Sequence, residues 1–347
     1  MRRVIRWLLF LLLFSETARA QLQSTISGKV IDAKTKEPLP GAVIFLAHTS
    51  IGASADNSGF FILDKIPPGK YDLTATLLGY QSWSRATPFS TDSIHNYVIA
   101  LEPSATLLDS VTVFGRKEKR NHTDYTRFIK YFLGQTSNAG KCKILNPHDI
   151  FAYTDQGQLI ALAKRPILIE NRALGYLVHY ELREFKFESV LQQIISSGVS
   201  RFEDLPPASD REKEKWSRER DRAYFGSTQH FVRSLEEGTL AANHFIMRNT
   251  DGVILTEKDL VTGLLIHYKT KIYIIFDGEL PEIYYPLRNK DHDQRSEIIF
   301  TGAPVRVYKN GYFEDFHGLI FDGYFGWSSG AAELLPLGYQ PVRKLKN

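Results

Sequence analysis

The stretch TISGKVIDAKTKEPLPGAVIFLAHTS, residues 25–50, opens a series of short apolar runs that ends with YVIAL at residues 97–101. Apolar and polar residues alternate along these runs, and turn-forming residues interrupt them, as in PLPG at 38–41 and DNSG at 56–59. Proline fixes φ and glycine accepts positive φ, so both favour turns between strands. This pattern predicts a small antiparallel β-sandwich in which each strand buries one face.

Two runs within this stretch differ in their patterning. Tyr71, Leu73, Ala75 and Leu77 alternate with polar residues, which predicts a strand with one buried face. The run from Ala42 to Ala47 is apolar at almost every position. It is therefore suited to a strand that is buried on both faces.

Several ordered blocks in this stretch resemble the carboxypeptidase regulatory-like family, whose fold is a transthyretin-like β-sandwich. The blocks are G-x-V-x-D from Gly28, PLPGA from Pro38, D-x-x-G-x-F from Asp56, I-P-x-G-x-Y-x-L from Ile66, and Gly79-Tyr80. The resemblance covers residues 25–113. Ala55 departs from it, because the family often has threonine there, and we expect altered hydrogen bonds in the turn with the same fold. The resemblance implies a folded accessory module of the bacterial envelope. It does not imply peptidase activity, because the same fold can carry different functional sites.

The composition of the chain is that of an ordinary globular protein. It has 347 residues, of which 24% are charged and 43% hydrophobic, and this length is ample for two cores. The formal net charge is +4, and residues 1–20 hold four basic residues and one acidic residue. Removing them leaves 39 basic and 38 acidic residues, a net charge of +1. A nearly neutral chain gives no support for nucleic-acid binding.

Residues 1–20 have the pattern of a secretory signal peptide. Arginines precede an apolar run at residues 7–14, and the small residues Ala18 and Ala20 predict cleavage before Gln21. An uncleaved N-terminal anchor is the alternative, but the run is shorter than the roughly 20 apolar residues that span a bilayer. We therefore expect an exported protein of the periplasm or outer membrane, with no transmembrane span after cleavage.

The rest of the chain predicts a second, larger domain. A charged stretch, RKEKR at residues 116–120, marks the boundary. We divide the chain into a signal peptide at 1–20, a sandwich at 21–113, a charged linker at 114–123 and an α+β domain at 124–347. Helical spacing of apolar residues predicts a helix ending near Gly134, and further helices are predicted at 210–222 and 227–237, with strands between and after them.

This second part resembles, more weakly, an uncharacterised C-terminal region that accompanies the regulatory-like module in some envelope proteins of gram-negative bacteria. The matching pieces include IENxALGY from Ile169 and GSxxHF from Gly226. They are mostly apolar packing and turn signals. The resemblance therefore implies no chemistry for these residues.

The search for catalytic and metal-binding motifs leads to no site. A zinc peptidase needs two histidines and a glutamate on the metal, and no histidine is followed by glutamate at His-x-x-Glu spacing. Ser328 lies in GWSSG, which matches a nucleophile elbow, but neither Asp nor His follows it. The polar cluster Asp291-His292-Asp293 is interpreted as a solvated turn, and Cys142, the single cysteine, as a buried and inert thiol. We predict no catalytic, cofactor-binding or metal-binding residue.

The helix at residues 210–222, DREKEKWSRERDR, carries charge on nearly every face, and Trp216 is its one large apolar residue. A solvated helix is one interpretation, and a docking helix with Trp216 as its partner contact is the other.

Two classes of function remain. The first is a non-enzymatic binding or structural protein of the envelope, whose partner is a protein or a glycan and, by analogy of modules, an outer-membrane transporter. The second is a hydrolase, acting on peptides or glycans, with an unrecognised site in residues 124–347. A pocket with converging acid, base or nucleophile groups would favour the enzyme, and a shallow apolar surface would favour binding.

Overall fold

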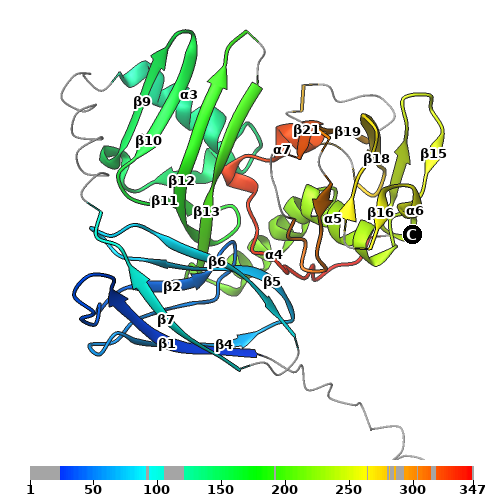
Figure 1. The fold of residues 1–347 in the computed structure, drawn as a ribbon. Helices are drawn as coiled ribbons and strands as arrows, with labels where there is room; N and C mark the ends of the chain where they lie inside the picture. The colour runs from blue at the N-terminus through cyan, green and yellow to red at the C-terminus, as the bar shows by residue number, and fades with distance from the viewer. Residues whose placement is uncertain are drawn as a thin grey trace, which may run out of the picture.

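The computed structural model (Figure 1) describes most of the chain. The described residues are 24–90, 94–104, 121–190, 193–263, 265–279, 281, 285–286, 293–302, 304–313 and 318–345. The predicted signal peptide with Ala18, Ala20 and Gln21 lies outside them, as do residues 114–120 of the predicted linker and the pair Asp291-His292.

Seven strands form the N-terminal β-sandwich, as the sequence pattern predicts. They are β1 (Ser24–Asp32), β2 (Val43–Leu46), β3 (Gly52–Ser54), β4 (Phe60–Ile66), β5 (Gly69–Thr76), β6 (Trp83–Phe89) and β7 (Ile94–Leu101). One sheet has the order β4-β1-β7 and the other β3-β2-β5-β6. Buried and less buried residues alternate along β1, where Ile26 and Val30 are fully buried between the sheets.

One strand pair of the sandwich departs from the predicted antiparallel arrangement. Strands β1 and β7 pair in parallel from Thr25 to Asp32, whereas the other pairs of the sandwich are antiparallel. The chain crosses to the other sheet and returns before it forms β7, so β7 can run in the same direction as β1. Gly28 permits this pairing, because a Cβ at that position would lie 2.1 Å from the Tyr97 carbonyl oxygen.

A six-stranded sheet and a helix begin the larger α+β region. The elements are α3 (His122–Leu133), β8 (Cys142–Ile144), β9 (Ile150–Asp155), β10 (Gln158–Ala163), β11 (Ile167–Asn171), β12 (Tyr176–Glu188) and β13 (Gln193–Asp204). Their order is β8-β11-β12-β10-β9, and β13 pairs with the remaining side of β12. Helix α3 packs over β9 and β10, and Phe128 of the helix meets Phe185 of β12 edge to face, with 4.8 Å between ring centroids.

The remaining elements form a second sheet flanked by helices. The helices are α4 (Asp210–Tyr224), α5 (Thr228–Glu237), α6 (Glu257–Leu260) and α7 (Tyr324–Ser328). The strands are β14 (Phe245–Arg248), β15 (Ile254–Leu255), β18 (Lys271–Phe276), β19 (Gln294–Phe300) and β21 (Leu319–Gly323), with a small sheet of β16 (Val261–Thr262), β17 (Leu265–Ile266) and β20 (Val305–Arg306). One apolar core is continuous through both sheets of this region. Its antiparallel sheets and separate helices make the region α+β, as predicted. No helix among the described residues is long and apolar enough to cross a membrane.

The sandwich packs against the α+β region through the outer face of β2 (Figure 1). Phe45 and Ala47 are buried against Val199 of β13, while Ile44 and Leu46 face the sandwich core. This explains the continuous apolar run in the sequence, because both faces of the strand have an apolar neighbour.

Hydrogen bonds reinforce this contact at the end of β2. Thr49 forms a parallel bridge with Arg201, in which the Phe202 amide donates to the Thr49 carbonyl at 3.0 Å. The His48 amide donates to the Ser200 carbonyl at 2.6 Å. The segment that follows β2 therefore extends the six-stranded sheet at its β13 edge.

Candidate binding groove

A groove of about 620 Å³ opens between helix α3 and strand β8. Its walls are mostly apolar and come from one side of the helix and from the strand at the end of the sheet. The lining residues are His122, Tyr125, Ile129, Leu133, Cys142, Lys143, Ile144 and Pro147.

The helical wall follows from the apolar spacing of α3. Tyr125, Ile129 and Leu133 recur at intervals of four residues and therefore lie on one side of the helix. Phe128 and Phe132 lie on the side that packs on the sheet, with their rings stacked 5.0 Å apart. The helix thus has apolar residues on two sides, of which one lines the groove.

Capping residues fix where this helix begins and ends. The Asn121 side chain accepts a hydrogen bond from the Thr123 amide at 3.0 Å, as an N-cap residue does. At the other end Gly134 has a φ of +91°, which glycine adopts most readily, and it ends the helix as the sequence predicts.

Strand β8 forms the opposite wall and contains the single cysteine. Cys142 is half-buried, and its thiol lies 3.5 Å from the carbonyl oxygen of Asn138. Burial, with the nearby Glu333 carboxylate, raises the pKa of Cys142 to about 12, and this outweighs the opposite effect of Lys141. The thiol therefore stays protonated near neutral pH and is a poor nucleophile, as expected from the sequence, although the residue is half-buried and not buried.

The C-terminal stretch supports the turn that joins α3 to β8. Glu333 accepts hydrogen bonds from the Thr136 hydroxyl and from Asn138 Nδ2, the latter at 3.1 Å. Asn171, which is fully buried, donates through Nδ2 to the Ala332 carbonyl at 2.9 Å. Residues that are about 200 positions apart in the sequence thus hold this turn in place.

A second exposed apolar surface lies on the outer face of the sheet β4-β1-β7. Phe60 and Ile62 of β4 point outward, as do Ile94 and Val98 of β7, and Val98 is 72% exposed. Lys29 of β1 lies between Phe60 and Val98 in the register of the strands.

The residues that suggested enzyme chemistry have intramolecular contacts. Ser328 ends the one-turn helix α7, and its hydroxyl donates to the Tyr324 carbonyl at 2.7 Å. His179 Nε2 lies 3.3 Å from a carboxylate oxygen of Glu203, and burial lowers the pKa of His179. Asp293 pairs with Arg295 at 3.1 Å. Within the part of the chain that the structure describes, no three His, Cys, Asp or Glu side chains gather as metal ligands would.

Trp216 lies inside the molecule, with 3% of its surface exposed. Its indole Nε1 donates to the Arg172 carbonyl at 3.0 Å. The ring fills the space beside Gly175, where a Cβ would come within 2.3 Å of the indole. Packing within the chain accounts for this tryptophan, and its ring has almost no surface left for the partner contact that the sequence suggested.

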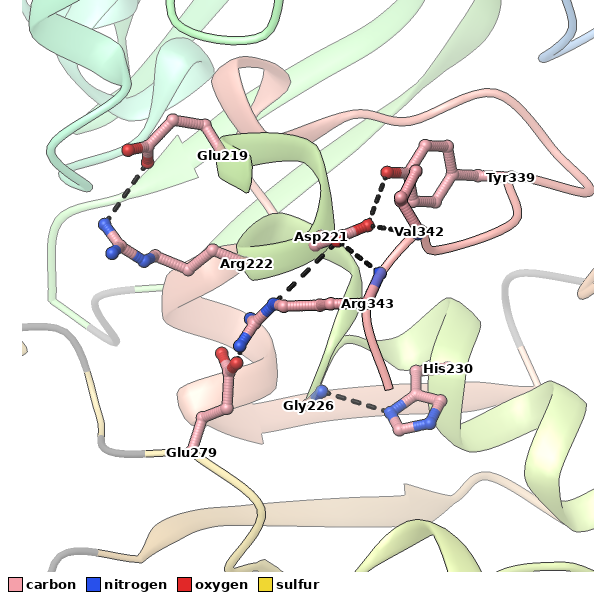
Figure 2. A network of polar contacts seen from close by, with 9 residues as sticks. All are labelled: Glu219, Asp221, Arg222, Gly226, His230, Glu279, Tyr339, Val342 and Arg343. Atoms are coloured by element: carbon pink, nitrogen blue, oxygen red, sulfur yellow. Dashed lines mark hydrogen bonds and ion pairs between the residues drawn. The ribbon is translucent and has the colours of Figure 1, made fainter. Parts of the chain in front are cut away.

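The same helix carries a buried acid that the sequence does not reveal. Asp221 is 2% exposed and accepts hydrogen bonds from the Tyr339 hydroxyl at 2.7 Å and from the amides of Val342 and Arg343, each at 3.0 Å (Figure 2). Arg343 also pairs with Glu279, whose pKa is raised by burial. Asp221 thus fastens the C-terminal segment to α4. Its position in a run of charged residues gave no sign of this role.

His230, in the GSxxHF block, is a buried neutral histidine. Its Nδ1 accepts a hydrogen bond from the Gly226 amide at 3.2 Å (Figure 2). Aromatic rings surround it, including Phe245, whose ring centroid is 4.9 Å away. Burial lowers the pKa of His230 to about 3, so the ring is neutral near pH 7 and cannot serve as a general acid.

The fold is that of a β-rich protein with a seven-stranded N-terminal sandwich. Residues 26–113 match the model of the CarboxypepD_reg-like domain, which confirms the family resemblance of this part of the chain. A search of curated proteins finds no match.

Solved structures share only a limited likeness with this chain. A 3-chlorocatechol 1,2-dioxygenase from Rhodococcus opacus has 11% identity and a TM-score of 0.20, over 24% of this chain and 60% of that one. The pilus 2b backbone protein of group B streptococcus has 17% identity and a TM-score of 0.20, over 24% and 42% of the two chains. A streptococcal ancillary pilin has 14% identity and a TM-score of 0.21, over 24% and 30%. The match spans at most 60% of each of these three proteins, and scores this low carry no argument about function.

Proposed function

We propose that this protein is a non-enzymatic binding protein of the bacterial cell envelope. The sandwich is its accessory module, and the groove between α3 and β8 is the surface that holds a protein or glycan partner. The alternative is a hydrolase with its site in the α+β region.

The chemistry of the groove is the observation that carries this proposal. Tyr125, Ile129 and Ile144 give it apolar walls, and its thiol is held protonated by burial. Hydrolysis by nucleophilic catalysis requires an activated nucleophile with a base in hydrogen-bond reach. Apolar walls with a few polar groups at the rim suit non-covalent binding of a partner.

A crosslinking experiment tests whether the groove holds the partner. A photoreactive amino acid is placed at Ile129 in the full chain, which is expressed in its native cells. Lys130, the next residue on α3 and exposed, is the matched control, and Ile62 reports on the outer face of the sandwich. We expect one crosslinked species from position 129 and none from position 130. Crosslinking from Ile62 alone would move the binding surface to the sandwich.

A direct assay tests the hydrolase alternative. The purified chain is incubated with peptide and glycan substrates, and any turnover is measured again after the substitution Cys142→Ala and after Ser328→Ala. We expect no turnover. Turnover that either substitution abolishes would overturn the proposal and place an active site in the α+β region.

Export and the envelope location are part of the proposal. The basic and apolar pattern of residues 1–20 and the presence of the regulatory-like module support them. An outer-membrane transporter is the partner that the analogy of modules suggests. N-terminal sequencing of the protein from a periplasmic or membrane fraction tests the location, and we expect it to begin at Gln21. A chain that retains Met1 in the cytoplasm would contradict this.

A further inference from the structure

Strand β13 leaves part of one edge of the six-stranded sheet uncovered. Strand β12 pairs with it along one side, from Gln193 to Asp204. On its other side the bridge with Thr49 occupies the end near Arg201. Among the described residues, no segment pairs with that side of residues 193–199.

The bridge shows which backbone groups face the open edge. The Ser200 carbonyl accepts from His48 and the Phe202 amide donates to Thr49, so the backbone groups of Ser200 and Phe202 point away from β12. Alternate residues of a strand point their N–H and C=O groups to the same side. The backbone groups of Ile194, Ser196 and Gly198 therefore also point to the open edge.

The side chains of this stretch do not protect the edge. Its sequence, QIISSGV at residues 193–199, has no charge and no proline, which are the features that keep exposed edges from pairing. Ile194 and Ile195 lie on opposite faces of the strand, and they are 44% and 45% exposed. Both faces of the strand thus leave apolar surface in contact with water.

We propose that residues 193–199 pair antiparallel with the same residues of a second copy of this chain, with Ser196 opposite Ser196. In this register the outward backbone groups of residues 194, 196 and 198 meet their counterparts in hydrogen-bonded pairs. Ile194 of one copy lies opposite Gly198 of the other, where there is no side chain to oppose it. Ile195 lies opposite the small side chain of Ser197.

The length of the open stretch fits this arrangement. It begins at Gln193, where β13 starts, and ends at Val199, just before the residues that the His48-Thr49 segment occupies. An antiparallel pair centred on Ser196 places Gln193 of one copy opposite Val199 of the other. Each copy thus uses its whole open edge without displacing the sandwich segment.

The charge and the size of the contact set its strength. The stretch is uncharged, so two copies can approach without like charges facing each other across the new pair. Seven residues on each side form a contact well below the roughly 1,200 Å² of a stable interface. We therefore expect a reversible dimer that dissociates on dilution.

Sedimentation velocity of the full chain tests the proposal over about a hundredfold range of concentration. We expect a monomer at the low end and a dimer at the high end. Ile195→Lys places a charge in the new pair on both copies and should weaken dimerisation about tenfold. Val190→Lys is the matched control, because Val190 lies on the same hairpin, is 87% exposed and is outside the paired stretch. A monomer at every concentration, or equal effects of both variants, would overturn the proposal.

Disulfide trapping tests the register separately. In a Cys142→Ala background, Ser196→Cys places the new thiols opposite each other, with Cα atoms about 5.5 Å apart and within disulfide range. Ser197→Cys places them two positions out of register, beyond the roughly 7 Å limit between Cα atoms. We expect a disulfide-linked dimer from position 196 and none from position 197. Equal trapping at both positions, or trapping at 197 alone, would overturn this register.

Discussion

The Tyr80 hydroxyl donates a hydrogen bond of 2.9 Å to Oδ2 of Asp32, across 48 positions of sequence. The other oxygen of Asp32 accepts from the amides of Lys34 and Thr35, at 2.7 and 2.9 Å. These three contacts hold the loop after β1 against the turn after β5. Asp32 and Tyr80 belong to two of the blocks that resemble the regulatory-like family, and this contact gives a physical reason why both occur in one module.

The first prediction concerns the acid stability of this contact. Hydrogen bonds from Thr35, Tyr80 and Lys34 lower the pKa of Asp32 below its ordinary value of 3.8. Its contribution to stability is therefore present above pH 3.8 and is lost as the pH falls through the lowered folded-state pKa. Asp32→Asn and Tyr80→Phe should each lower the melting temperature at pH 7.

Calorimetry at neutral pH and well below pH 3.8 measures this effect. The difference between the native chain and Asp32→Asn should shrink at the acidic pH. Tyr97→Phe is the control, because it removes a hydroxyl from the same module away from Asp32. A difference of the same size at both pH values would show that the carboxylate charge does not stabilise the loop.

The second prediction concerns His48 and His230, whose pKa values are lowered. Burial lowers the pKa of His230 to about 3 and that of His48 to about 4, against an ordinary value of 6.5. Below pH 6.5 the unfolded chain binds protons at these positions and the folded chain does not, so stability falls as the pH falls. Each histidine should contribute a slope of up to about 1.4 kcal/mol per pH unit.

Urea unfolding between pH 7 and about pH 5 measures this slope. The slope should be smaller in His230→Gln than in the native chain, even though that variant is less stable overall. His122→Gln, at an exposed position, is the control for the substitution itself. Stability that is constant over this pH range would contradict the prediction.

The third prediction concerns the contact between the sandwich and the α+β region. Asn310 is 6% exposed and donates through Nδ2 to the Lys70 carbonyl at 2.7 Å, and the Tyr312 hydroxyl donates to Asp72 at 3.1 Å. Asn310→Ala leaves a carbonyl of β5 without this donor and should cost about 1–3 kcal/mol. Amide hydrogen exchange in β5 should become faster. Asn96→Ala, on the exposed side of β7, should have little effect on either measurement.

The fourth prediction concerns the C-terminal segment. Asp221→Ala removes the acceptor for three donors, including the Tyr339 hydroxyl, and leaves Arg343 without that carboxylate. Loss of a buried, charged partner of this kind costs about 3 kcal/mol or more. We expect protease cleavage near the C-terminus to become faster. Glu214→Ala, in the same helix with an exposed side chain, should change stability by less than about 0.5 kcal/mol.

The sequence by itself determined the features that neighbouring residues control. Asp56 accepts hydrogen bonds from the amides of Ser58 and Phe60, so the hairpin turn follows from residues within four positions. Ser209 caps α4 through the Glu212 amide, and the Glu212 carboxylate accepts from the Ala208 amide. Local hydrogen bonds and alternation need only a short stretch of chain, so strands, turns and helix ends could be predicted from the sequence.

Only the tertiary structure decided which residues are buried by distant segments. Trp216 and Asp221 belong to a helix whose sequence indicates a solvated surface, yet both are buried by residues far from them in the chain. The parallel pairing of β1 with β7 and the open edge of β13 also depend on where distant strands come together. The groove is another such feature. Its two walls are α3 and β8, and no local sequence pattern predicts that these two elements lie side by side. Burial is a property of the assembled core, and for these residues the sequence carries no local sign of it.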